Sequence, residues 1–163
     1  MAAKAKPQLD ACFERLSAAR SEEEAQSVEA DIWRLWSDSG NAATDRLLAT
    51  GSRALSRGRF APAIALFNAL VERAPDFAEA WNKRATLYYL IGEYEFAATD
   101  IQRTIEREPR HFGALSGLGM IYLQWSDKAR ALKAFEEALS VHPYLSGARN
   151  AVESLSKALT RER

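Results

Sequence analysis

The sequence predicts an all-α protein built from antiparallel helix pairs that stack side by side. Ala, Leu, Glu and Arg, which favour helices, are abundant, whereas Gly and Pro supply only 8 and 5 of the 163 residues. In addition, Pro75, Pro109 and Pro143 are spaced 34 residues apart, and other residue types repeat with the same step. A chain of this length can bury a core without a disulfide or a metal.

The repeat divides the middle of the chain into three units, 44–77, 78–111 and 112–145. In each unit, positions 4, 8 and 11 share one face of a first helix, and positions 20, 24 and 27 share one face of a second. Small residues at positions 8 and 20 let the two helices approach, and proline at position 32 ends the second helix because it lacks an amide hydrogen. In that order, the recurring residues are Leu47, Trp81, Leu115; Gly51, Ala85, Gly119; Ala54, Tyr88, Tyr122; Ala63, Ala97, Ala131; Phe67, Ile101, Phe135; and Leu70, Thr104, Ala138.

Residues 1–43 are predicted to form a further helical hairpin, either a degenerate repeat or a cap. Ser21 and Glu24 are spaced as a capping box at the start of its second helix. We expect Trp33 and Trp36 to be buried where this hairpin meets the first unit.

Residues 146–163 are predicted to form a C-terminal capping helix followed by a charged tail. A stack of helix pairs must cover its last apolar face with a helix whose outer side is polar. The segment fits because its apolar residues fall on one stripe: Ala148, Val152, Leu155 and Leu159.

The repeating residues resemble the tetratricopeptide repeat (TPR) family, whose unit is a 34-residue helix–turn–helix. The third unit matches best, while Thr50 and Arg84 stand at position 7 of the first two units, where the family usually has Leu. Ala54 likewise stands where the family usually has Tyr. The resemblance implies a right-handed superhelix of antiparallel helix pairs, a TPR solenoid, whose concave groove is lined by the first helix of each unit.

The family's groove positions, carried over to this sequence, imply a peptide-binding wall of mixed polar and apolar residues. Asn82 could both donate to and accept from the main chain of an extended peptide. Gly113 and Gly117 either thin the wall so that a partner's backbone can approach, or are ordinary surface positions. The favoured contacts are Asn82, Lys83, Thr86, Tyr89, Ser116, Gly117, Met120 and Gln124. The remaining implied wall positions are Asp45, Leu48, Ser52, Leu55, Ser56, Glu79, Leu90, Gly113 and Leu123.

Several functional classes are not expected. The 22 basic and 22 acidic residues cancel, which argues against a nucleic-acid partner or a basic membrane anchor. No apolar stretch reaches the roughly 18–20 residues of a membrane-spanning helix. Cys12 alone cannot form an internal disulfide or a thiolate zinc site. His111 and His142 are interpreted as turn residues that are solvated or cap helix ends, so we expect no catalytic residue, metal or cofactor.

A particular use of the family's groove is also not expected. Repeat domains that hold the C-termini of heat-shock chaperones use a carboxylate clamp of Lys, Asn and basic residues. The corresponding positions here hold one basic residue among five: Leu48, Ser52, Lys83, Gly113 and Gly117. We therefore expect no chaperone carboxylate clamp.

The sequence thus predicts a non-enzymatic protein–protein interaction module, an adaptor, scaffold or assembly factor that binds a peptide or helix in its groove. The alternative is a self-associating structural subunit, and the sequence leaves open whether the protein forms a homo-oligomer. We expect a cytoplasmic protein, or a periplasmic one if the native gene encodes an export signal before Met1.

Overall fold

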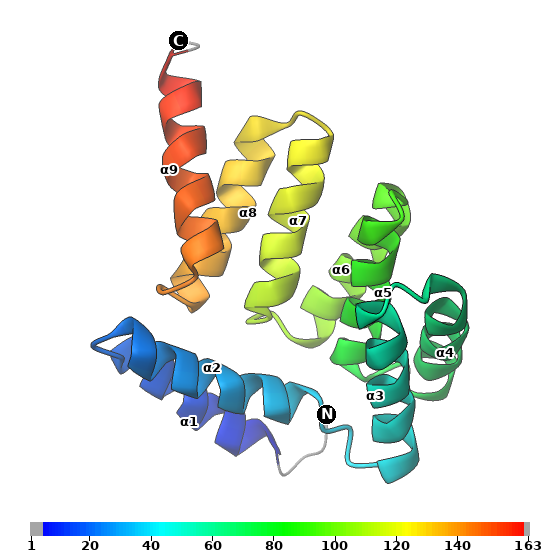
Figure 1. The fold of residues 1–163 in the computed structure, drawn as a ribbon. Coiled ribbons are helices and arrows are strands. Elements are labelled where there is room, and N and C mark those ends of the chain that lie inside the picture. The colour runs from blue at the N-terminus through cyan, green and yellow to red at the C-terminus, as the bar shows by residue number, and fades with distance from the viewer. Residues whose placement is uncertain (1–4, 162–163) are drawn as a thin grey trace.

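The computed structural model describes residues 5–161, which form nine α-helices and no strand (Figure 1). Residues 1–4 of the predicted hairpin and residues 162–163 of the predicted tail lie outside this range. The helices are α1 (Ala5–Ala18), α2 (Glu22–Trp36), α3 (Ala42–Ser56), α4 (Phe60–Arg73), α5 (Ala78–Leu90), α6 (Tyr94–Arg107), α7 (Phe112–Gln124), α8 (Lys128–Val141) and α9 (Ser146–Arg161).

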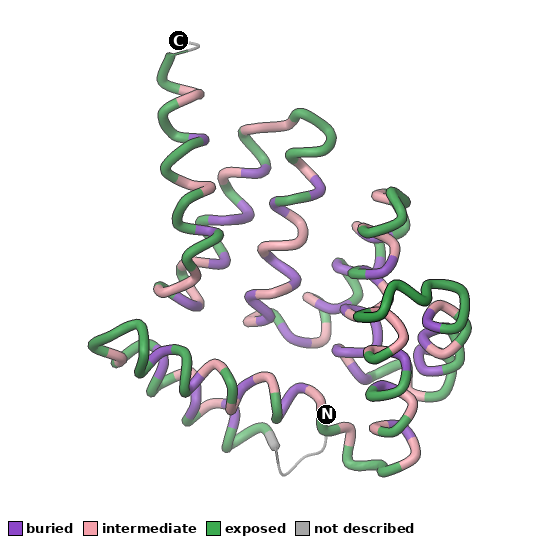
Figure 2. Tube along the Cα trace, viewed as in Figure 1, coloured by how far each residue is buried: buried purple, intermediate pink, exposed green. Residues whose placement is uncertain are grey.

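Three antiparallel pairs, α3/α4, α5/α6 and α7/α8, stack in order, and α9 packs on α8 (Figure 1). Buried positions recur along each pair (Figure 2). Each pair turns through a residue in the left-handed region, where glycine is favoured. These residues are Gly58 at φ 69°, Gly92 at φ 82° and Ser126 at φ 58°. The third pair thus makes the same turn with a serine, at a cost in backbone strain.

The predicted close approach of paired helices is confirmed at position 8. A Cβ atom placed on Gly51 would lie 2.6 Å from Cε1 of Phe67, and one on Gly119 would lie 2.8 Å from the ring of Phe135. Both distances are shorter than real Cβ contacts, so these sites have no room for a methyl group. The second pair instead combines a buried Ala85 with the smaller Ile101.

Arg84, which departs from the family pattern at position 7, has a charged partner on the facing helix. Its Nε and Nη2 donate to the two carboxylate oxygens of Asp100 at 2.7 and 2.9 Å. This paired hydrogen bond raises the pKa of Arg84, and Asp100 is buried on α6. The guanidinium also lies 5.2 Å from the centre of the Trp81 ring. A complementary pair therefore replaces the usual leucine.

The N-terminal hairpin does not stack on the first unit. Helices α1 and α2 lie with their axes across those of α7 and α9, beside the lower ends of these helices in the view of Figure 1. Its apolar cluster includes Leu9, Leu16, Ile32 and Trp36 and is completed by Phe112 at the start of α7, with no residue of α3 or α4.

The expected burial of Trp33 and Trp36 against the first unit was therefore wrong. Both rings contact Phe112 of the third unit, and Trp36 stacks on His111, the last residue of the second unit, with ring centres 4.0 Å apart. Glu29 falls at repeat position 20, where close helix packing in the three units uses a small residue. Its carboxylate instead pairs with His142 and accepts from Trp33 Nε1, so this hairpin departs from the packing of the repeats.

The predicted N-cap Ser21 is confirmed at the start of α2, and Glu24 reaches back to the amide of Arg20 instead of that of Ser21. Ser21 Oγ accepts from the amide of Glu24 at 3.2 Å, and Glu24 Oε2 accepts from the amide of Arg20 at 3.0 Å.

Candidate peptide-binding groove

A cleft of about 300 Å³ lies between α5 and α7, the first helices of the second and third units. Its walls are mostly apolar, with a few polar groups from both helices. It is lined by Asn82, Ala85, Thr86, Tyr89, Leu90, Ile101, Gly113, Ser116, Gly117 and Met120. Leu90 and Met120 are 54% and 42% exposed, so water contacts apolar side chains along this face.

Six of the eight favoured contacts line this cleft, and two do not. Lys83 Nζ lies 3.7 Å from Glu79 Oε1 and 6.0 Å from the centre of the Trp33 ring. Gln124 donates to the Tyr89 hydroxyl at 3.3 Å and thereby links α7 to α5. Lys83 and Gln124 therefore support neighbouring residues instead of lining the cleft.

A buried hydrogen-bond network supports the base of the cleft. His111 Nδ1 accepts from the amide of Ala114 at 3.0 Å, and its Nε2 lies 2.9 Å from Glu79 Oε2. Because Nδ1 is an acceptor, Nε2 carries the proton and donates to Glu79. Asn82 Nδ2 donates to the same carboxylate at 3.3 and 3.4 Å. The carboxamide expected to bind a peptide backbone is therefore already engaged through its nitrogen.

Two expectations about these residues need correction. His111 was expected to be solvated or to cap a helix end. It caps α7, and it is fully buried. Glu79 and Leu48, placed on the groove wall by the family positions, are also buried. The N-terminal hairpin explains the burial of His111, because Trp36 of this hairpin covers the imidazole ring.

A second cleft, of about 560 Å³, lies between α2 and the helices α7 and α9. Glu22, Gln26, Glu29 and Trp33 line it from α2. It shares Gly113, Ser116 and Met120 with the first cleft, so the two clefts adjoin along α7. Sequence reasoning missed this wall because it placed the hairpin, as a degenerate repeat or a cap, against the first unit. The charge of Glu29 at a small-residue position was the available signal.

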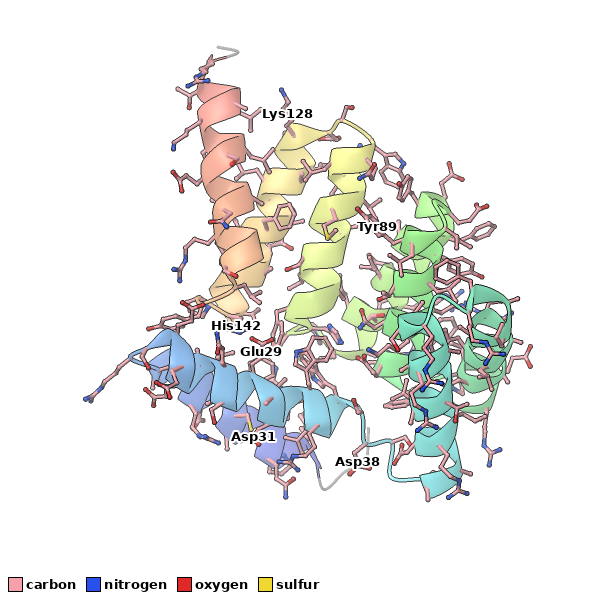
Figure 3. All side chains as sticks on the ribbon, in the orientation of Figure 1. Glu29, Asp31, Asp38, Tyr89, Lys128 and His142 are labelled. Carbon is pink, nitrogen blue, oxygen red and sulfur yellow. The ribbon has the colours of Figure 1, made fainter. Side chains whose placement is uncertain are left out.

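His142 ties the hairpin to the far end of this groove (Figure 3). Its Nε2 lies 2.7 Å from Glu29 Oε2, and its Nδ1 accepts from the amide of Tyr144 at 3.3 Å. Trp33 Nε1 donates to the other oxygen of Glu29 at 3.3 Å. Hydrogen bonding to His142, more than to Trp33, lowers the pKa of Glu29. Like His111, His142 is buried and stands at a helix end, here as the C-cap of α8, so of the two alternatives the helix cap is confirmed and the solvated turn residue is not.

The two glycines on α7 serve different purposes. A Cβ atom on Gly113 would lie 2.8 Å from Cη2 of Trp33, so the space there is occupied by the chain's own hairpin. The interpretation that Gly113 admits a partner's backbone was therefore wrong. A Cβ atom on Gly117 would meet only the Cδ1 atom of Ile101, at 3.2 Å. A methyl group on Gly117 would therefore require a small shift of Ile101, which lines the first cleft.

Within residues 5–161, no three His, Cys, Asp or Glu side chains are grouped closely enough to hold a metal ion. In the same range, no helix has the length and apolar character needed to cross a membrane.

Comparison with known proteins identifies the repeat. A family model described as "Tetratricopeptide repeat" matches residues 48–103 and 83–146. A TPR repeat-containing protein of Rhizobium etli is 34% identical over 158 residues, which cover 97% of this chain and 78% of that protein. The Hsp70-Hsp90 organizing protein of Triticum aestivum is 30% identical over 114 residues, 70% of this chain but only 20% of its own length.

Solved structures share the fold. The first TPR domain of Spaghetti (RPAP3), bound to the HSP90 peptide SRMEEVD, superposes with a TM-score of 0.68 at 20% identity, covering 72% of this chain and 93% of that one. MamA superposes with a TM-score of 0.67 at 20% identity, and the match covers 85% of this chain and 79% of the MamA chain. These likenesses confirm the predicted all-α superhelix, a fold typical of protein–protein interaction modules. The chain belongs to the tetratricopeptide repeat family.

Proposed function

We propose that this protein is a non-enzymatic adaptor or scaffold that binds a peptide segment or helix of another protein in the cleft between α5 and α7. The observation that supports this most strongly is the open, apolar cleft between two adjacent first helices, with Met120 and Leu90 exposed to water. Exposed apolar side chains in a concave site gain free energy when a ligand covers them. Thr86, Tyr89 and Ser116 supply the polar groups that orient such a ligand.

The proposed ligand is held along its length and not by a terminal carboxylate. Of the five clamp positions, Leu48 is buried, Ser52 carries no charge, and Lys83 pairs with Glu79. Gly113 and Gly117 have no side chain to donate. The RPAP3 domain is bound to a chaperone peptide, but this groove lacks the cations with which a clamp would hold a terminal carboxylate.

A matched pair of substitutions tests the groove. Thr86 and Thr99 are both exposed, and each hydroxyl donates to a backbone carbonyl one turn earlier at 3.0 Å. Thr86 lines the cleft, whereas Thr99 lies on α6, outside it. Thr86→Arg places a long charged side chain in the cleft, and Thr99→Arg repeats the change elsewhere at a similar cost in folding.

The measurement is affinity capture from the source cell, quantified by mass spectrometry, with circular dichroism to check folding. We expect the partners captured by the wild-type protein to be retained by Thr99→Arg and lost with Thr86→Arg. If both variants retain the same partners, the cleft is not the binding site. The self-associating subunit stays an alternative, and a concentration-independent monomer in sedimentation would remove it.

A further inference from the structure

The N-terminal hairpin extends the groove beyond the cleft between α5 and α7. Met120 lines both clefts, so a ligand that covers it can continue from α5 toward α2 and α9. Trp33 is packed against Gly113, and Glu29 is bonded to His142, so this second wall is fixed in place. The full groove is therefore longer than the part formed by the repeats alone.

The charged residues that line the second cleft are all acidic. Glu22 and Glu29 line it, and none of the residues lining either cleft is Lys, Arg or His. Glu29 keeps a negative charge in its pair, because His142 accepts at Nδ1 and is therefore the neutral form that donates through Nε2. The Glu29 side chain is 30% exposed, so a ligand can reach it.

The rest of the second cleft is aromatic and aliphatic. Trp33 and Tyr144 contribute half-buried rings, which the chain's own Lys83 and Arg149 approach to 6.0 and 5.8 Å from the ring centres. Leu123 and Met120 are 40% and 42% exposed on the opposite wall. The two carboxylates attract the ammonium or guanidinium group of a peptide, and the apolar wall suits its apolar residues.

We infer that the groove selects a cationic amphipathic peptide segment, whose apolar residues cover Met120 and Leu123 and whose Lys or Arg side chain lies beside Glu22 and Glu29. This inference rests on the proposed function, since it names the kind of segment that the groove would take. The segment would cross from the α5–α7 cleft into the α2–α9 cleft. The N-terminal hairpin would then be a specificity-determining wall and not only a cap.

The test is selection of binders from a random library of short displayed peptides on the wild-type protein. The selection is repeated on Glu22→Gln, Glu29→Gln and Glu23→Gln. Glu23 is the matched control, because it is an exposed neighbour in the same helical turn but lines neither cleft. Glutamine at position 29 retains an oxygen that can accept from His142.

We expect wild-type binders to be enriched in Lys or Arg relative to the library. Each should bind Glu22→Gln or Glu29→Gln about threefold more weakly, as expected for one partly exposed ion pair, and Glu23→Gln unchanged. Binders without enrichment in Lys or Arg, or with enrichment that survives both glutamine substitutions, would overturn the inference. If those binders are still blocked by Thr86→Arg, the proposed function stands. If the selection yields no peptide that Thr86→Arg blocks, both fail.

Discussion

Exchanging the helix-packing pair of the third unit for that of the second tests how the repeats are built. Gly119 packs under Phe135, while the equivalent positions of the second unit hold Ala85 and Ile101. The substitutions are Gly119→Ala, Phe135→Ile and the two together. If paired helices are separated by the summed size of these two side chains, the double variant should recover much of what the single variants lose.

The magnitudes follow from the contacts. In Gly119→Ala the new methyl group lies 2.8 Å from the ring of Phe135, and such overpacking costs about 1–3 kcal/mol. The better helix propensity of alanine offsets about 1 kcal/mol of this cost. Phe135→Ile leaves a partly empty site and costs about 1–2 kcal/mol. Because the alanine methyl group then enters that space, we expect a favourable coupling of about 1 kcal/mol.

The assay is urea unfolding followed by far-UV circular dichroism for all four proteins. Gly147→Ala, alone and with Phe135→Ile, is the control, because a Cβ atom on Gly147 meets nothing within 4 Å. We expect the control pair to be additive. Additivity of Gly119→Ala with Phe135→Ile within about 0.3–0.5 kcal/mol would refute the reasoning.

Three further changes have defined outcomes. Ser126→Gly should raise the free energy of unfolding by about 1 kcal/mol, because Ser126 has a φ of 58°; urea denaturation measures it. Glu29→Gln should destabilise the protein at neutral pH, as measured by thermal unfolding. The lowered pKa of Glu29 stabilises the fold above the ordinary glutamate pKa of about 4.3, so the difference from wild type should shrink as pH falls through and below that value. Gly113→Ala should speed amide exchange in α1 and α2 but not in α3 and α4, because its methyl group would lie 2.8 Å from Trp33.

The repeats could be predicted from the sequence because each unit packs its two helices through a small residue on one helix and a large residue on the other. Gly51 with Phe67 and Gly119 with Phe135 show the size complementarity that the 34-residue step implies. The position of the clefts followed from the same register, since Thr86 and Met120 lie one repeat apart on equivalent helix faces.

The placement of the N-terminal hairpin could not be predicted in the same way. An amphipathic hairpin can cover either the side or the end of a stack, and its apolar stripe does not distinguish the two. The decisive partners, Glu29 and His142, are 113 residues apart. Nothing in the sequence around either residue indicates that the two form a pair. Arg84 and Asp100 show the same difficulty on a smaller scale, because only the facing helices reveal them as a pair.

The central claim is that ligands bind in the groove that Met120 lines. The chain has two methionines, Met1 and Met120, so a protein labelled with ¹³C-methyl methionine gives a simple spectrum. Met120→Leu assigns the signal of Met120. On addition of a peptide whose binding is shown independently by fluorescence anisotropy, we predict that the Met120 methyl signal shifts in proportion to occupancy. Saturation with a bound peptide that leaves this signal unmoved would contradict the claim.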